Sequence, residues 1–281
     1  MIVVLGANGQ LGSAFVRLLG REAIPVTRGD LDLADTGTIV PWLEHLRPDL
    51  VINCAAYTAV DQAEKDPDTA RRVNATAVGE LARGTAAIGA RLVTFSTDYV
   101  FDGNKGRPYV ESDPTSPINV YGSTKEEGER LALEADPQAL VIRTSWVMSG
   151  THQNFIRTIL RLMHAGPVRV VDDQVGRPTF ADDLAAGTMR VLDAGLTGIV
   201  HLTNAGQTTW WGLSREIAAM AGLEAEVVPI TTAESGRLAA RPADSRLDSE
   251  RLAAAGVASL PHYRESLERA VRQQLEGGVL L

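Results

Sequence analysis

Cysteine is almost absent from this sequence: Cys54 is the only one in 281 residues. A single cysteine excludes an internal disulfide and a cluster of thiolate metal ligands. Cys54 lies in an apolar run, which is typical of a buried structural thiol rather than a reactive one. The sequence therefore predicts neither a disulfide scaffold nor a set of metal ligands.

Long apolar runs are also lacking. No uninterrupted apolar segment is long enough to span a bilayer. No basic region precedes the apolar run at residues 2–5, so we expect no signal peptide. These two features predict a cytoplasmic protein that has no membrane partner.

Positive charge is in short supply. Lys and Arg together number 27 against 35 Asp and Glu, which leaves a formal net charge of -8. A nucleic-acid partner would require a basic face, so we expect none. A phosphorylated small ligand is not excluded, because a pocket needs only a few local donors. The length and the 44% of hydrophobic residues suit one large α/β domain, or one domain with a smaller lobe.

The first half of the sequence alternates short apolar runs with amphipathic stretches. The apolar runs predict strands at residues 2–5, 24–26, 50–53, 91–96 and 140–143, and the amphipathic stretches predict helices at residues 11–19, 37–46, 66–88 and 121–134. Continuous Val, Ile and Leu runs are typical of strands buried on both faces, and helices between them imply parallel crossovers. The pattern predicts an α/β fold with a Rossmann-type doubly wound parallel sheet.

Three glycines follow the first predicted strand and open the first predicted helix, with the spacing G-x-x-G-x-x-G. In such a turn one glycine permits the tight bend, another lets the backbone approach a pyrophosphate, and another lets helix and strand pack closely. The helix N-terminus then offers free N–H groups and a positive dipole end. The alternative is a glycine-rich turn of any α/β protein, but the strand before it favours a dinucleotide site. The predicted cofactor-binding residues of the turn are Gly6, Asn8, Gly9, Gln10, Leu11 and Gly12.

A dinucleotide site also needs residues that recognise the ribose near the end of the second strand. Arg28 stands there and could meet a 2′-phosphate, which would favour NADPH. Asp32 or Asp30 could instead contact the adenine or a ribose hydroxyl, and a solvated loop is the alternative for Arg28. Ala55 and Ala56 follow the third strand and leave room for a cofactor, although small residues also serve packing.

Tyr121 and Lys125 are four residues apart, so they share one face of a predicted helix. An ammonium near a phenol favours the phenolate and lowers the phenol pKa, which is about 10 when unperturbed. A phenol tuned in this way can give its proton to a carbonyl oxygen as hydride reaches the carbon. Thr97, at the end of the preceding strand, is placed to hold the same oxygen, and Ser96 competes for that role. The alternative is an exposed helical pair that matches Y-x-x-x-K by chance.

The pattern loosens after about residue 143. Helices are predicted at residues 154–164, 209–221 and 264–275, and strands at residues 168–171, 200–202 and 227–230. We find no internal repeat and no low-complexity linker. We therefore expect residues 1–150 to form an NAD(P)-binding Rossmann domain, with additional core elements from about 180–205. Residues 151–281 would form mainly a small C-terminal substrate-binding lobe.

Longer strings in the sequence carry a resemblance to a known family. They are GQLG at 9–12, INCAAYTAVD at 52–61, STDYVFDG at 96–103, YGSTK at 121–125, RTSWV at 143–147, DQVGRPT at 173–179, RP at 241–242 and SRLD at 245–248. With these strings the sequence resembles the extended short-chain dehydrogenase/reductase superfamily. Within it, the sequence is similar to the dTDP-4-dehydrorhamnose reductase family, from the first residue to at least Leu252.

The resemblance implies an NAD(P)H-dependent oxidoreductase that reduces the C4 ketone of a dTDP-sugar, dTDP-4-dehydro-L-rhamnose, to dTDP-L-rhamnose. It implies that Thr97, Tyr121 and Lys125 are catalytic and that Tyr121 and Lys125 also contact the cofactor. Further cofactor contacts implied are Asp32, Leu33, Ala55, Ala56 and Tyr57. Substrate contacts implied are Thr97, Asp98, Trp146, Gln174 and Arg177, and a plain core aromatic is the alternative for Trp146.

One position departs from the family pattern. Some members dimerise through a magnesium ion held by acidic residues, one of them two positions beyond the last glycine of the turn, where this sequence has Ala14. The sequence therefore gives no support for a metal-bridged dimer or a magnesium requirement, and we expect a monomer or a weak homodimer. NADPH is the expected cofactor, with NADH also accepted.

Two other functions stay open. One is a reductase or epimerase that acts on another nucleotide sugar. The other is a non-catalytic regulatory subunit that retains the fold and binds a partner enzyme. Loss of the tyrosine or the lysine would indicate such a subunit, but Tyr121 and Lys125 are both present.

Overall fold

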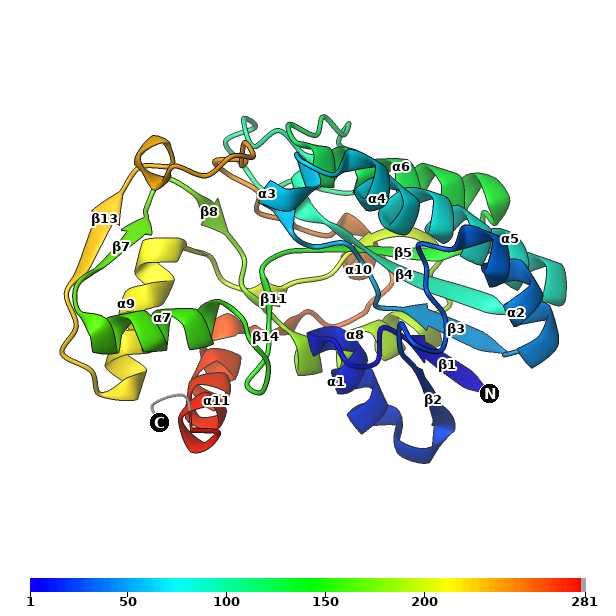
Figure 1. Cartoon of the computed structure of the whole chain (residues 1–281), viewed down its shortest axis with the longest axis horizontal. Coiled ribbons are helices and arrows are strands. Elements are labelled where there is room, and N and C mark those ends of the chain that lie inside the picture. Colours follow the sequence, from blue (N-terminus) through cyan, green and yellow to red (C-terminus); the bar gives the residue numbers. More distant parts are fainter. Residues whose placement is uncertain (279–281) are drawn as a thin grey trace.

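A six-stranded parallel sheet forms the centre of the larger part of the molecule (Figure 1). The computed structural model describes residues 1–278. Neighbouring strands follow the order β10-β5-β4-β3-β1-β2, and every neighbouring pair is parallel. The strands are β1 (Ile2–Leu5), β2 (Ala23–Val26), β3 (Leu50–Asn53), β4 (Arg91–Thr97), β5 (Leu140–Thr144) and β10 (Gly198–His201). The predicted Rossmann-type parallel sheet is therefore confirmed.

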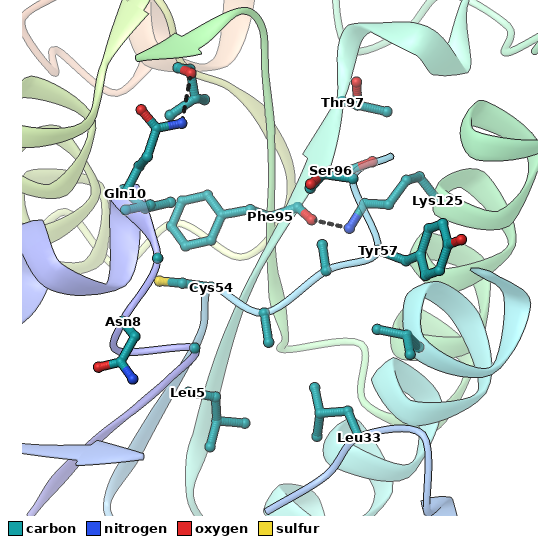
Figure 2. A pocket seen from close by; sticks show the side chains of 18 of the residues that line it. Leu5, Asn8, Gln10, Leu33, Cys54, Tyr57, Phe95, Ser96, Thr97 and Lys125 are labelled. Carbon is teal, nitrogen blue, oxygen red and sulfur yellow. Dashed lines mark hydrogen bonds between the residues drawn. The ribbon is translucent and has the colours of Figure 1, made fainter. Parts of the chain in front are cut away.

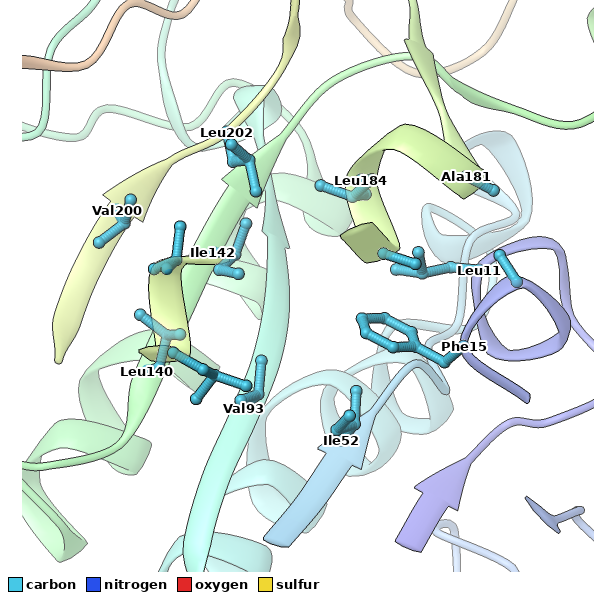
Figure 3. Close-up of a cluster of buried hydrophobic side chains, with 14 of the residues drawn as sticks. Leu11, Phe15, Ile52, Val93, Leu140, Ile142, Ala181, Leu184, Val200 and Leu202 are labelled. Atoms are coloured by element: carbon cyan, nitrogen blue, oxygen red, sulfur yellow. The ribbon is translucent and has the colours of Figure 1, made fainter. Parts of the chain in front are cut away.

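Helices cover both faces of this sheet. One face carries α1 (Gln10–Leu19) and α8 (Ala181–Asp193), and the other carries α2 (Ile39–Leu46), α5 (Ala77–Ile88) and α6 (Val120–Ala135). On the first face, Phe15 of α1 and Leu184 of α8 belong to the same buried cluster as strand residues Ile52, Val93 and Ile142 (Figure 3). Apolar side chains on both faces of the strands explain why their sequences read as continuous apolar runs.

The chain reverses its course across the sheet at β1. After β1 it forms β2 on one side, and it then returns to the other side of β1 to form β3. In open parallel sheets a ligand binds outside the carboxyl ends of the strands at such a reversal. The turn after β1 and the segment after β3 lie in contact there, because a Cβ placed on Gly6 would lie 2.9 Å from the Cα of Ala55.

The smaller part of the molecule lies at the far end from the N-terminus (Figure 1). It contains α7 (Phe155–Ala165), α9 (Trp210–Ala221) and α11 (Tyr263–Glu276), and β7 (Val168–Val171) pairs in parallel with β13 (Val227–Ile230). The three helices share a buried cluster through Ile156, Leu213 and Leu267. Short strand pairs complete it: β6 (Val147–Met148) with β9 (Thr179–Phe180), β8 (Val175–Gly176) with β12 (Thr208–Thr209), and β11 (Asn204–Ala205) with β14 (Leu260–His262).

Two helical features differ from the prediction. The helix predicted at residues 66–88 is divided into α4 (Pro67–Arg71), a π-helical turn at Arg72–Thr76 and α5. The sequence pattern also missed α8, a segment rich in alanine whose first residue follows Phe180, which makes no side-chain cap. Both features depend on contacts made elsewhere in the fold, and a local periodicity does not report those contacts.

The division into residues 1–150 and 151–281 remains a proposal, and residues 279–281 lie outside the described residues. Separate buried clusters in the two parts support it. The second half also sends α8 and β10 to the main sheet, where β10 extends the sheet beyond β5. Within residues 1–278, no helix combines the length and apolar character needed to cross a membrane.

Candidate active site

A cavity of about 850 Å³ opens at the carboxyl ends of β1, β3 and β4 (Figure 2). It brings together the turn after β1, the loop after β2, the segment after β3 and the start of α6. The predicted site residues that line it are Gly6, Asn8, Gly9, Gln10, Leu11, Arg28, Asp32, Leu33, Ala55, Ala56, Tyr57, Thr97, Asp98, Tyr121, Lys125 and Trp146. Of the predicted residues, Gly12, Gln174 and Arg177 are not part of this lining.

The glycine turn is built by close backbone packing. Gly6 has a φ of 70°, in the left-handed region that favours glycine. A Cβ on Gly12 would lie 2.2 Å from the Gly6 carbonyl oxygen, so only glycine lets α1 approach β1 this closely. Gly9 caps α1 without a side-chain hydrogen bond. The first N–H groups of α1 therefore have no side-chain acceptor from the cap, and the start of this helix lines the cavity, as binding of an anionic group would require.

The Gln10 side chain, predicted to contact the cofactor, is instead bonded to residues 147–154. Its Oε1 accepts hydrogen bonds from Ser149 Oγ (3.1 Å) and Asn154 Nδ2 (2.9 Å), and its Nε2 donates to the Val147 carbonyl (3.3 Å). These bonds tie the start of α1 to the connection that leads into the smaller part. A cofactor contact of Gln10 would therefore come from its backbone N–H.

At one end of the cavity, Arg28 and Asp32 form an exposed ion pair with Nη2–Oδ2 at 3.1 Å. The backbone N–H of Ala34 is the main cause that lowers the pKa of Asp32, and Arg28 adds to the effect. Asp30 is occupied within its own loop, because its carboxylate accepts bonds from Thr27 N (2.8 Å) and Thr27 Oγ1 (2.7 Å). Of the two aspartates considered for the ribose, Asp32 alone lines the cavity.

The segment after β3 is held by an asparagine that the sequence analysis missed. Asn74 accepts a hydrogen bond from Tyr57 N (2.8 Å) and donates one to the Tyr57 carbonyl (3.0 Å). Asn74 is buried and lies in the π-helical turn Arg72–Thr76. Such turns are frequent at functional sites because they redirect side chains from the regular helix. No local spacing indicated this residue, since its partner is distant in sequence.

At the other end of the cavity, Tyr121 and Lys125 lie in the first turns of α6. Asn119 caps this helix by accepting a hydrogen bond from Gly122 N at 2.7 Å. A Cβ on Gly122 would lie 2.1 Å from the Tyr99 carbonyl oxygen, so the glycine lets the helix start against the end of β4. This packing explains how Tyr121 comes to lie beside Thr97, the last residue of β4.

The electrostatics of Tyr121 differ from the sequence prediction. The pKa of Tyr121 is raised to about 12, mainly by burial; Thr97 lowers this pKa and Asp98 adds to the increase. Lys125 does not contribute to this shift; its Nζ instead donates to the Phe95 carbonyl oxygen at 2.6 Å (Figure 2). Burial lowers the pKa of Lys125 to about 8, and Glu129 partly opposes this effect. The expected lowering of the phenol pKa by Lys125 is therefore wrong for this structure.

The sequence left Thr97 and Ser96 as the two candidates for the hydroxyl that holds the substrate carbonyl oxygen. Thr97 Oγ1 donates to Asp98 Oδ1 at 3.0 Å and accepts a hydrogen bond from Tyr99 N at 3.2 Å. Ser96 Oγ is buried and has no hydrogen-bond partner within the described chain. Thr97, unlike Ser96, acts on the pKa of Tyr121, which favours Thr97 for the role beside the phenol.

Trp146 combines the two interpretations that the sequence left open. Its ring stacks on Trp210 with centroids 3.6 Å apart and planes 9° apart, and it also lines the cavity. Its φ of 47° is rare for a non-glycine residue and requires support from its surroundings. A Cβ on Gly176 would lie 2.3 Å from the Trp146 ring, so this glycine gives the indole its space.

Gln174 and Arg177 make contacts away from the cavity. Gln174 is buried and donates to Thr232 Oγ1 at 2.8 Å. Arg177 lies 3.7 Å from the Asp248 carboxylate. Neither residue is therefore part of the lining of the 850 Å³ cavity, and a contact of Gln174 or Arg177 with substrate stays a prediction.

Among residues 1–278, no three or more His, Cys, Asp or Glu side chains are grouped so that they could hold a metal ion. Ala14 is buried on α1, in the cluster that also contains Leu184 of α8.

The lining of the cavity fits a nicotinamide dinucleotide. Backbone N–H groups at the start of α1 suit a diphosphate. Arg28 and Asp32 lie where one ribose would be recognised. The small side chains of Ala55 and Ala56 leave space in the cavity for the cofactor. Tyr121 and Lys125 stand at the opposite end, where hydride chemistry requires a proton donor.

Comparisons with known proteins agree with this site. The family model described as the RmlD substrate binding domain matches residues 1–276. The chain is 40% identical to a dTDP-4-dehydrorhamnose reductase of Burkholderia thailandensis, over 98% of this chain and 99% of the relative. It is also 40% identical to a probable dTDP-4,6-dihydroxy-2-methyloxan-3-one 4-ketoreductase of Streptomyces antibioticus, over 95% of this chain and 93% of that relative.

A solved structure shows the same likeness. The crystal structure of dTDP-4-dehydrorhamnose reductase from Bacillus anthracis in complex with NADP has a TM-score of 0.93 and 35% identity, over 97% of this chain and 98% of that one. The fold, the cavity and the near full-length match lead to one conclusion. This chain belongs to the RmlD substrate-binding domain family, the family of the dTDP-4-dehydrorhamnose reductases, within the extended short-chain dehydrogenase/reductase superfamily.

Proposed function

We propose that this protein reduces the C4 ketone of dTDP-4-dehydro-L-rhamnose to dTDP-L-rhamnose with NADPH. The observation that carries the proposal is one cavity lined both by the glycine turn after β1 and by Thr97, Tyr121 and Lys125. The activity for which near full-length relatives are named supports the choice of sugar. The protein is thus a nicotinamide-dependent oxidoreductase of nucleotide-sugar metabolism.

Each residue of the site has its own role in the reduction. When bound, the reduced nicotinamide supplies a hydride. Tyr121 gives its phenolic proton to the C4 oxygen, and a pKa of about 12 keeps that proton on the phenol at neutral pH. The Thr97 hydroxyl holds the same oxygen, and Lys125 binds the ribose next to the nicotinamide. Asp98 and Trp146 hold the sugar ring, since both line the cavity beside Thr97.

The preference for NADPH rests on Arg28. Arg28 lines the cavity and its side chain is 79% exposed, so the guanidinium is free to move onto a 2′-phosphate. The NADP in the Bacillus anthracis structure supports this choice. We expect NADH to be accepted as well. Ala14 gives no support for a magnesium requirement. A monomer or weak homodimer in the cytoplasm remains our prediction.

The test is NADPH oxidation, followed by absorbance, with a panel of nucleotide 4-keto sugars. Fast oxidation with dTDP-4-dehydro-L-rhamnose and formation of dTDP-L-rhamnose supports the proposal. Turnover of a different nucleotide ketosugar alone would leave the superfamily assignment intact and overturn the substrate. Absence of any turnover, with the tyrosine and lysine intact, would favour a regulatory subunit.

A reductase of another nucleotide sugar is the second candidate. The Streptomyces antibioticus relative, equally identical at 40%, is named for a different dTDP-ketosugar. The same panel separates these two candidates. An epimerase retains its cofactor through a complete cycle, so tightly bound NAD in the purified protein would identify that activity instead.

A further inference from the structure

Trp146 has an unusual position at the end of the main sheet. It follows β5 by two residues, lines the 850 Å³ cavity and has a φ of 47°. A positive φ is costly for a bulky side chain, so it persists only where the surroundings fix it. The backbone is fixed by a hydrogen bond that the Trp146 carbonyl accepts from Thr179 N at 3.2 Å. The orientation of the ring depends on other contacts.

The face of the Trp146 ring lies against Trp210. The two ring centroids are 3.6 Å apart, and the ring planes differ by 9°. This separation is close to the thickness of an aromatic ring and leaves little sideways offset, whereas free aromatic pairs prefer an offset stack or an edge-to-face contact. The backbone of the two residues therefore imposes the arrangement. Trp210 itself does not line the cavity, so its influence on a ligand there would pass through Trp146.

A second contact on the same ring comes from Gly176. A Cβ on Gly176 would lie 2.3 Å from Cε2, 2.5 Å from Cζ2 and 2.7 Å from Nε1 of Trp146. Any side chain at this position would displace the indole. The contacts with Trp210 and Gly176 together leave the ring little freedom to turn.

One strand pair provides both contacts. Gly176 belongs to β8, which pairs antiparallel with β12, and Thr208 lies opposite Gly176 in that pair. Trp210 follows β12 directly as the first residue of α9. Phe155 of α7 packs against Trp210 in turn, with the ring centroids 4.5 Å apart. The smaller part of the molecule thus orients a side chain that belongs to the end of the main sheet.

We propose that Trp210 is a positioning residue of the ketosugar site, which holds the Trp146 indole in the orientation that contacts the sugar ring. This inference rests on the proposed function, in which Trp146 is a substrate contact. Without the stack the indole turns among several orientations, and the sugar loses its contact while the cofactor keeps its own. Trp210 therefore affects the binding of the ketosugar and not the binding of NADPH.

The test is a double-mutant cycle of Trp146→Ala, Trp210→Ala and the double variant, measured as KM and kcat with dTDP-4-dehydro-L-rhamnose. We expect kcat/KM to fall about 10-fold in each single variant, and through the same parameter in both, as for residues in contact. The double variant should lose no more than Trp146→Ala, because Trp210 acts through that ring. Independent effects would multiply to about 100-fold instead.

Two further variants separate stacking from simple filling of space. Trp210→Phe keeps a flat ring and should retain most of the wild-type kcat/KM. Trp210→Leu fills the space without a flat face and should resemble Trp210→Ala. Both preserve packing against Phe155 better than alanine does, so they carry the test if Trp210→Ala does not fold. Titration followed by NADPH fluorescence should give the same Kd for NADPH in every variant.

The stack can also be measured without substrate. The chain has four tryptophans, so proton–nitrogen correlation NMR of the labelled protein gives few indole N–H signals, each assigned from its own variant. Trp210→Leu should shift the Trp146 signal, because the ring current of the stacked indole is lost. Trp211→Leu is the matched control on the same helix, and it should leave the Trp146 signal in place.

Any one of three results would overturn the proposal: losses that multiply in the double variant, a Trp210→Leu enzyme with wild-type kcat/KM, or a Trp146 signal that does not move in Trp210→Leu. Wild-type kinetics in Trp146→Ala would also overturn it, because the substrate contact would be absent. If the wild type does not reduce dTDP-4-dehydro-L-rhamnose, that failure concerns the proposed function. The cycle is then measured with the nucleotide ketosugar that the protein does reduce.

Discussion

Arg28 donates two hydrogen bonds to one oxygen of Asp32, from Nε and Nη2, each at 3.1 Å. The pair lies at the edge of the cavity with the arginine side chain 79% exposed. An exposed pair of this kind is worth little, about 0.2–1 kcal/mol, so a phosphate can replace the carboxylate as the partner of the guanidinium. The pair holds Arg28 beside the cavity but is weak enough for the guanidinium to exchange its partner.

Arg28→Ala is expected to reduce the preference for NADPH over NADH while it spares NADH. The guanidinium would be lost as partner of the 2′-phosphate, which NADH does not carry. The measurement is kcat/KM with each cofactor. Arg17→Ala is the matched control, because Arg17 forms an exposed pair with Asp182 outside the cavity. Equal losses with both cofactors would show that Arg28 is structural.

Tyr121→Phe is expected to lower kcat by about 10²–10⁴-fold and to leave NADPH binding nearly unchanged. The ring still packs edge-on against Tyr99, whose centroid lies 5.8 Å away, but the proton donor is gone. NADPH binding is measured by fluorescence titration. Tyr263→Phe is the control, since it removes a phenol that bonds Glu216 in the smaller part. Activity within a few-fold of wild type would remove Tyr121 from the mechanism.

The sequence was most informative where structure follows from a local pattern. The strand before Gly6 and the four-residue spacing of Tyr121 and Lys125 are both local, and each predicts a place in the fold. The environment of Tyr121 was not local: its phenol pKa depends on burial, on Asp98 and on Thr97. The prediction that Lys125 lowers this pKa failed because periodicity places a side chain on a helix face but does not fix the acceptor that its ammonium finds.

Contacts between distant segments explain the other omissions. Asn74 is one polar residue in an amphipathic stretch, and its importance appears only when the π-helical turn brings it to Tyr57. Gln174 lies in the loop that carries the string DQVGRPT. This string implied a substrate contact, but it did not indicate the direction of the Gln174 amide, which donates a hydrogen bond to Thr232. Side-chain direction in a loop is set by tertiary partners, so a string of residues cannot supply it.

Trp146→Ala is expected to raise the KM for the dTDP-sugar or lower kcat without unfolding the protein. The indole lines the cavity and stacks on Trp210, and loss of such a stack costs about 0.5–1.5 kcal/mol beyond the area buried. NADPH affinity should not change. Trp211→Ala is the control, because Trp211 bonds the Val227 carbonyl outside the cavity. Unaltered kinetics in Trp146→Ala would make this residue a core aromatic only.

Asn74→Ala is expected to weaken NADPH binding and to lower the free energy of unfolding. Both backbone groups of Tyr57 lose their partner, and each buried unpaired group costs about 1–3 kcal/mol. The segment that lines the cavity after β3 would then lose its support. Urea unfolding and a cofactor titration measure the two effects. Asn104→Ala, which removes an exposed bond to Asp102, should change neither quantity. An Asn74→Ala protein with wild-type cofactor affinity would contradict this prediction.

The last prediction concerns stability against pH and a histidine away from the cavity. His201 is 2% exposed, and its Nδ1 lies 2.9 Å from the Asp248 carbonyl oxygen. Burial, and after it the Arg143 charge, lowers the pKa of His201 to about 4. In the unfolded chain an imidazole binds its proton near pH 6.5. The folded pKa is thus lower than the unfolded one.

The sign of the pH effect follows from these two pKa values. Between about pH 6.5 and about pH 4 the imidazole of His201 binds a proton in the unfolded chain but not in the folded protein. The unfolded state is therefore stabilised relative to the folded state as pH falls. The contribution of neutral His201 is therefore complete above pH 6.5 and is lost on acidification toward pH 4. His201→Gln keeps an amide N–H for the carbonyl and cannot titrate. In urea unfolding at several pH values, the wild type should lose more free energy of unfolding than His201→Gln across this window. Parallel curves for the two proteins would show that His201 does not titrate on unfolding.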